Sequence, residues 1–134
     1  MILAALSGLV AFAIDAGTKR LVVARLDEGR LYAGVGQWGL RVVHNQRGSF
    51  ARLSTSVAVA LWAALTTAVI LLHPGAVAVA IGLGLVLGGG AANLVERARR
   101  GAVVDFVALG RWPVFNLADA AMVAGLALVI VGVR

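Results

Sequence analysis

The chain has 134 residues, of which 61% are hydrophobic and 13% carry a charged side chain. Soluble domains of this length are about half apolar and about one quarter charged, so the composition argues against a soluble protein and favours a single-domain integral membrane protein. The net charge is +6, and because the basic residues lie beside apolar segments, membrane lipids with anionic headgroups are better partners for them than nucleic acid.

Four apolar segments follow one another along the chain, each near the roughly 20 residues that a helix needs to cross a bilayer. We expect helices over residues 1–23, 54–72, 76–95 and 114–133. No basic residue precedes the apolar part of the first segment, which favours a retained helix over a cleaved signal peptide. His73, Pro74 and Gly75 predict a tight turn between the second and third helices. The expected fold class is therefore all-α integral membrane, with four transmembrane helices and one domain over residues 1–134.

The two long connections, residues 24–53 and 97–113, lie on the same side of the membrane if all four segments span it. Apart from Arg134, every charged residue lies in these connections or at the adjoining helix ends. Residues 30–36 and 40–43 form short, partly alternating runs flanked by glycine, which predict a small interfacial β-sheet in the first long loop. The excess of basic residues, taken alone, would place this side in the cytoplasm.

Two aspartates in apolar surroundings are the first candidates for chemistry. Asp105 ends the connection from the third helix, and Asp119 lies about five residues into the fourth, followed by fourteen uncharged residues. A carboxylate at the edge of a membrane span is costly, which makes it a functional candidate. Two carboxylates that meet share a proton and can perform acid–base chemistry as in aspartic proteases. The alternative is a helix-capping Asp105 and an Asp119 that is only hydrogen-bonded to Asn116.

Further polar residues fall at helix ends that face the same side. They are Asp15, Thr18 and Lys19 after the first segment, Asn45 before the second, and Asn93, Glu96 and Arg97 after the third. Convergence of so many polar residues on one face favours a site over packing. A rival chemistry pairs Lys19, the only lysine, with a serine such as Ser49, Ser54 or Ser56, although their spacing singles out none. His44 is expected at the surface.

Five motifs make the chain similar to the lipoprotein signal peptidases, the signal peptidase II family of membrane aspartic peptidases. Residues 15–19, DAGTK, resemble the family's D-Q-x-T-K. Residues 45–50, NQRGSF, resemble N-x-G-x-A-F, and residues 88–97, GGGAANLVER, resemble G-G-x-x-G-N-L-I-D-R. Residues 103–106, VVDF, and 115–119, FNLAD, match the family motifs V-V-D-F and F-N-x-A-D directly. The resemblance covers nearly the whole chain.

The resemblance implies removal of signal peptides from prolipoproteins, just before a diacylglyceryl-modified cysteine. It implies that Asp105 and Asp119 are the catalytic residues of a membrane peptidase domain. It also implies substrate binding or support of this pair by Asp15, Asn45, Asn93, Arg97 and Asn116. The implied partners are lipid-modified prolipoproteins and membrane lipids, with no metal or organic cofactor, and the chain lacks the cysteines that thiolate metal sites need. The implied location is the bacterial cell membrane, with the active site facing outward and both termini in the cytoplasm.

Four positions depart from the family motifs: Ala16, Arg47, Ala92 and Glu96. These departures motivate an alternative function, a catalytically inactive relative that binds lipoproteins or lipids. A small proton- or ion-conducting bundle is a third hypothesis, because carboxylates within membranes also serve as relays. Conduction requires polar groups through the whole bilayer, and the helices have almost none toward the opposite side.

Overall fold

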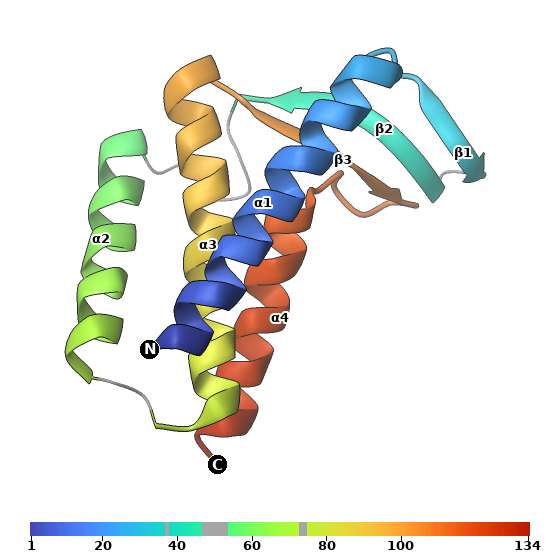
Figure 1. The fold of residues 1–134 in the computed structure, drawn as a ribbon. Coiled ribbons are helices and arrows are strands. Elements are labelled where there is room, and N and C mark those ends of the chain that lie inside the picture. Colours follow the sequence, from blue (N-terminus) through green and yellow to red (C-terminus); the bar gives the residue numbers. More distant parts are fainter. Residues whose placement is uncertain (37, 47–53, 73–74) are drawn as a thin grey trace.

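The computed structural model describes residues 1–36, 38–46, 54–72 and 75–134. Within these residues, four helices and three strands follow one another as α1 (Ile2–Arg25), β1 (Leu31–Val35), β2 (Trp38–Asn45), α2 (Thr55–Leu72), α3 (Val77–Arg100), β3 (Val103–Leu109) and α4 (Leu117–Gly132). The helices form a bundle, and the sheet lies at the end of the bundle that is remote from both termini (Figure 1).

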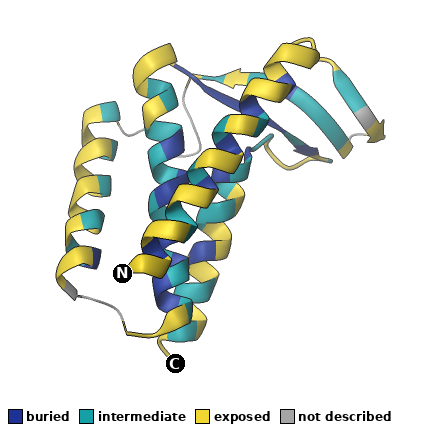
Figure 2. Ribbon diagram, in the orientation of Figure 1, coloured by how far each residue is buried: buried dark blue, intermediate teal, exposed yellow. Residues whose placement is uncertain are grey.

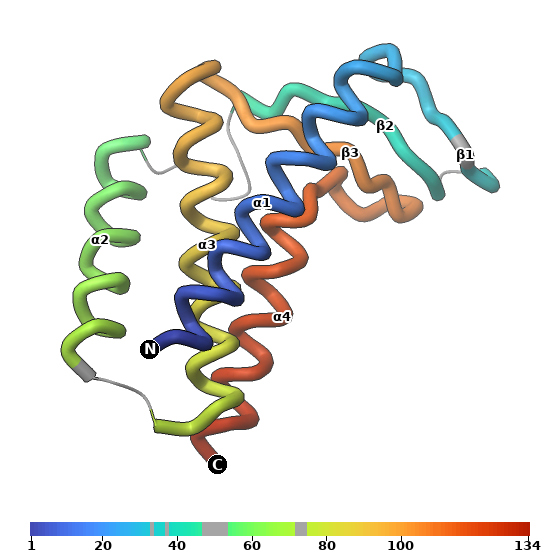
Figure 3. The backbone as a smooth tube through the Cα atoms, viewed as in Figure 1, coloured from blue at the N-terminus to red at the C-terminus, as the bar shows by residue number. Residues whose placement is uncertain are grey.

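Small residues allow the helices to approach one another closely. The tube trace in Figure 3 shows α3 between α2 on one side and α1 and α4 on the other. A Cβ atom added at Gly88 of α3 would meet the backbone of Gly8 in α1, and one at Gly82 would meet the backbone of Gly125 in α4. Such contacts between backbones are typical of helices packed within membranes, where small residues form the interfaces.

The outer faces of the helices are apolar. Figure 2 shows exposed residues along the outside of the bundle, and among them Ile2 is 76% exposed and Val123 is 72% exposed. Among the described residues, α1 and α3 are each long and apolar enough to cross a membrane, whereas α2 and α4 are apolar but shorter. The burial pattern is therefore that of a protein whose exterior faces lipid, and the count of four spans remains a prediction.

The sheet is antiparallel, with strand order β1-β2-β3. The first long loop supplies β1 and β2, as the sequence predicted, but the third strand was missed because β3 comes from the second connection. In the β2–β3 pairing, Val43 lies opposite Asp105 and Asn45 lies opposite Val103. The first four residues of β3 are all buried, so its sequence lacks the alternation that identified the other two strands.

Two helix boundaries differ from the sequence prediction by three residues or more. α3 continues to Arg100 instead of ending at Val95, and it ends where Gly101 adopts a left-handed conformation with φ +72°. Its last turn carries three arginines, which interact favourably with the negative end of the helix dipole. α4 begins at Leu117 instead of residue 114, because Asn116 caps it. The predicted turn at His73 and Pro74 lies outside the described residues.

Candidate active site

The start of α4 holds the carboxylate of Asp119 in place. Asn116 is the N-cap of this helix, and its side-chain oxygen accepts a hydrogen bond from the Asp119 N–H at 2.9 Å. The Asp119 carboxylate in turn accepts from the Asn116 N–H at 3.5 Å, completing a capping box. Asp119 is thus the third residue of the helix, not about the fifth as the sequence suggested, and its charge lies where the helix dipole favours an anion.

The carboxylate of Asp105 projects from β3 into the same region and is buried. Its Oδ1 accepts a hydrogen bond from Asn116 Nδ2 at 2.7 Å, and its Oδ2 accepts one from Asn45 Nδ2 at 2.8 Å. Burial raises the pKa of the Asp105 carboxyl above its ordinary value; the hydrogen bond from Asn45 lowers it and the negative charge of Asp119 raises it again. Asp105 is therefore a group that retains its proton more readily than an exposed aspartate.

A third asparagine extends the network from Asp119 to α1. Asn93 Nδ2 on α3 donates to Asp119 Oδ1 at 3.0 Å, and Asn93 Oδ1 accepts from Lys19 Nζ at 2.8 Å. The structure therefore brings Asp105, Asp119 and the three asparagines into one hydrogen-bond network.

Lys19 is the centre of a buried group of charges that we call the ion cluster, formed by Asp15, Lys19 and Glu96. Lys19 Nζ lies 2.7 Å from Asp15 Oδ2 and 3.0 Å from Glu96 Oε2. The side chain of Lys19 is 4% exposed, that of Asp15 is 1% exposed and that of Glu96 is 11% exposed. Buried charges require partners of opposite sign, and this cluster provides them.

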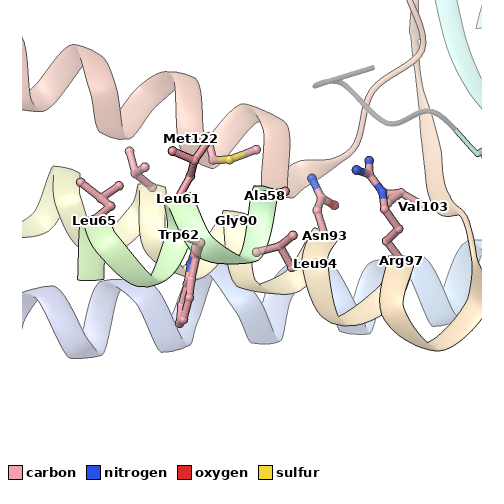
Figure 4. Close-up of a pocket in the computed structure, with 11 residues that line it drawn as sticks. Ala58, Leu61, Trp62, Leu65, Gly90, Asn93, Leu94, Arg97, Val103 and Met122 are labelled. Atoms are coloured by element: carbon pink, nitrogen blue, oxygen red, sulfur yellow. The ribbon is translucent and has the colours of Figure 1, made fainter. Parts of the chain in front are cut away.

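Two apolar grooves adjoin the network. The first, which we call the α2–α3 groove, has a volume of about 200 Å³. Figure 4 shows Asn93 and Arg97 at one end of it, beside Val103, and apolar side chains such as Leu65 toward the other. The second, which we call the α4 groove, has a volume of about 980 Å³ and includes Asp119 in its lining. Its other lining residues include Trp38, Asn45, Trp112, Phe115 and Val123.

The rival site residues lie in other environments. Ser54 and Ser56 are hydrogen-bonded to each other at 3.0 Å, and Ser49 lies outside the described residues. His44 Nδ1 is 2.8 Å from Glu28 Oε1 in an exposed part of the sheet. Among the residues that the structure describes, no three His, Cys, Asp or Glu side chains are grouped as metal ligands would be.

The sequence profile of the family described as signal peptidase (SPase) II matches residues 8–133. The chain belongs to the signal peptidase II family. Among its relatives, the lipoprotein signal peptidase of Rhodococcus jostii is 38% identical over 147 residues, covering 98% of this chain and 71% of that protein. The lipoprotein signal peptidase of Moorella thermoacetica is 35% identical over 127 residues, covering 90% of this chain and 85% of that protein.

Solved structures share the fold of this signal peptidase II chain. One, described as a bacterial membrane enzyme, has a TM-score of 0.84 at 20% identity and covers 97% of this chain and 91% of its own. A second structure with the same description has a TM-score of 0.82 at 18% identity. This likeness shows that the bundle and its small sheet form a fold that both solved structures share.

Within this signal peptidase II fold, the candidate site residues that the sequence predicted lie close together. Lys19 and Glu96 also belong to the network. Asp15 is joined to α4 by a hydrogen bond from the Ala118 N–H at 2.9 Å, and Arg97 lines the α2–α3 groove one turn after Asn93. The sequence placed Lys19 and Glu96 on the same face as the aspartates but assigned neither of them to substrate binding or to support of the pair, and both are bound directly to the network. Their spacing, four residues after Asp15 and three after Asn93, indicated the shared helix faces, but it carried no signal for the contact between α1 and α3 that joins them.

Proposed function

We propose that the chain is an aspartic endopeptidase that removes signal peptides from diacylglyceryl-modified prolipoproteins. Membership of the signal peptidase II family supports the reaction and the substrate class. The observation that carries the aspartic mechanism is the bridge formed by Asn116, whose amide donates to Asp105 while its carbonyl fixes the turn that holds Asp119. A bridge of this kind keeps two carboxylates in a constant relative geometry.

In the proposed mechanism Asp105 and Asp119 share one proton. Asp105 holds it, since burial favours its neutral form, and Asp119 acts as the base from the first turn of α4. Asp119 takes a proton from a water molecule, whose oxygen attacks the scissile carbonyl carbon while Asp105 donates to the carbonyl oxygen. The C–N bond then breaks, and the leaving amine of the modified cysteine takes up a proton from the pair.

The two grooves offer apolar surfaces for the apolar parts of this substrate. The α4 groove contains Asp119 and Asn45, so we assign the scissile segment to it. Its volume of about 980 Å³ is within the range of about 300–1,000 Å³ typical of ligand sites. Asn93 and Arg97 at the mouth of the α2–α3 groove supply polar contacts for the substrate backbone or for the lipid ester groups.

We further propose that all four helices span the bacterial cytoplasmic membrane as one domain over residues 1–134, with the site facing outward. α4 has 16 residues, which at 1.5 Å per residue is about 24 Å and shorter than the roughly 30 Å of a hydrocarbon core. A short span is accommodated by local thinning of the bilayer, and thinning beside α4 would bring the lipid-modified cysteine closer to Asp119. Membrane lipids are then direct partners of the exposed helix faces.

The test is cleavage of a purified diacylglyceryl-modified prolipoprotein by the parent, by Asp105→Asn and by Asp119→Asn. Both variants should lose at least about 1,000-fold in kcat, because each removes one half of the acid–base pair. Asp27→Asn, which changes an aspartate that is 80% exposed, is the matched control and should retain parental activity. Cleavage by both site variants would contradict the pair. A folded parent that binds the substrate without cleaving it would instead support the inactive relative.

A further inference from the structure

Each acidic member of the ion cluster binds the backbone immediately before one of the two candidate catalytic aspartates. Asp15 Oδ1 accepts from the N–H of Ala118, the residue before Asp119, at 2.9 Å. Glu96 Oε2 accepts from the N–H of Val104, the residue before Asp105, at 3.3 Å. Both carboxylates also bind Lys19, so a single ammonium joins the two backbone contacts.

Lys19 also binds Asn93, which is itself hydrogen-bonded to Asp119. Lys19 Nζ donates to Asn93 Oδ1, which fixes the orientation of the Asn93 amide so that its NH2 group faces Asp119 Oδ1. If the amide were reversed, its oxygen would face a carboxylate and its NH2 group would face an ammonium. Lys19 therefore selects the only orientation in which Asn93 donates to Asp119.

Charges buried in this way are a poor source of stability. Removing two charges from water costs several kcal/mol each, and an apolar replacement of similar volume is often as stable or more so. A buried cluster is better explained by the geometry that it enforces. Here that geometry includes β3 and α4, the two elements that carry Asp105 and Asp119, and it links both to α1 and α3.

We propose that Lys19 and Glu96 are positioning residues for the reaction, which hold Asp105 and Asp119 at their working separation through the backbones of Val104 and Ala118. Its catalytic consequence rests on the proposed peptidase function. Neither side chain touches the reacting atoms, so both act through other groups. Substitution of either changes the rate of the chemical step more than it changes the binding of substrate.

The length of the Glu96 side chain is part of the inference. Its Oε2 reaches both Lys19, on α1, and the Val104 N–H, on β3. An aspartate, which the family motif carries at this position, is one methylene shorter and would not span both partners on this backbone. The longer side chain of Glu96 thus suits the distance between α1 and β3 in this chain.

The experiment measures amide hydrogen exchange at Val104 and Ala118 by NMR, with the full chain in detergent micelles. Glu96→Ala should raise the exchange rate of the Val104 amide about tenfold or more, since a hydrogen bond to a charged acceptor is lost, and leave Ala118 nearly unchanged. Glu96→Asp should also raise exchange at Val104, because it keeps the charge but not the reach. Glu96→Gln, whose amide oxygen still reaches Val104, should exchange more slowly than Glu96→Ala.

Cleavage by the same variants supplies the second readout, normalised to the fraction of folded protein. Glu96→Ala and Lys19→Met should lower kcat by about 10- to 100-fold, the size expected for a misplaced catalytic group, with KM within about threefold of the parent. Glu28→Ala, which removes an exposed glutamate paired with His44, is the matched control and should change neither constant.

The two readouts separate the possible failures. Unchanged exchange at Val104 in Glu96→Ala, or an unchanged kcat in this folded variant of an active parent, would overturn the positioning role. A variant with a raised KM and an unchanged kcat would also overturn the positioning role. If the parent cleaves no lipidated substrate, the proposed function fails, while faster exchange at Val104 alone would still establish that Glu96 holds β3 in place.

Discussion

At the scale of single residues, Asn116 has two structural roles that an ionised aspartate could not combine, because its carboxylate only accepts hydrogen bonds. Its oxygen caps α4 and thereby sets the position of Asp119, while its NH2 group donates to Asp105. The residue is completely buried, so each of its polar atoms needs a partner within the protein. The side-chain amide of Asn116 supplies an acceptor and a donor on two separate atoms, so it contacts both partners at once.

The raised pKa of Asp105 predicts a pH dependence of stability. The folded protein holds this proton at pH values where the unfolded chain has lost it, so the stability due to Asp105 is fully present below about pH 4 and is lost as the pH rises through the raised pKa. Asp105→Asn lacks this titration. The melting temperature of the variant minus that of the parent should therefore increase between pH 4 and pH 8. Thermal unfolding in micelles at several pH values measures it, and a constant difference would contradict the assignment.

At the scale of elements, contacts between glycines decide where α1 and α3 cross, and the crossing places Lys19 beside Asn93 and Glu96. Gly8 and Gly88 each leave no room for a side chain at this crossing. Since the two helices supply all three members of the ion cluster, their separation controls the distances within it. Packing in the middle of the bundle thus affects the site at its end.

Substitution of Gly88 should therefore lower both stability and activity. In Gly88→Ala the added methyl group meets the backbone of Gly8, which cannot move aside, and overpacking of this kind costs about 1–3 kcal/mol. Gly17→Ala is the control, because a Cβ at this helical position meets nothing within 4 Å and should leave stability unchanged or increase it. Melting temperatures of both variants in micelles test the packing. Equal melting temperatures for Gly88→Ala and Gly17→Ala would contradict this prediction, because they would show that α1 and α3 can move apart at no cost in stability.

At the scale of the whole molecule, charge is distributed very unevenly. Apart from Arg134, the charged residues lie in the sheet, in the connections around it or at the adjoining helix ends. Both chain termini lie toward the opposite end of the bundle (Figure 1). The basic residues near the site would by themselves favour a cytoplasmic location of this end, whereas the proposed function requires it to face outward.

A reporter fused to the C-terminus distinguishes these orientations. We expect a fluorescent protein that folds only in the cytoplasm to be bright at this position, and a phosphatase that is active only outside to be silent. The reason is that the proposed four spans would return the C-terminus to the side of the N-terminus, away from the site. The reverse pattern, with a silent fluorescent protein and an active phosphatase, would contradict the outward-facing site.

Sequence alone was enough to predict the membrane class, the small sheet and the set of polar residues that gather at one end of the bundle. Hydropathy, turn residues and the motifs around Asp105 and Asp119 are properties of short segments, so they can be recognised without the fold. It did not reveal β3, whose buried residues give no alternation, nor the start of α4, which depends on how Asn116 is hydrogen-bonded.

Which polar groups contact one another depends on how the helices and strands pack together. Lys19 and Asn93 are 74 residues apart, and Asp15 and the Ala118 N–H are 103 residues apart. Whether such groups touch depends on where helices cross and how far each extends, and both are consequences of packing between backbones. For this reason the sequence located the carboxylates and asparagines of the candidate site, while the roles of Lys19 and Glu96 emerged from the assembled bundle.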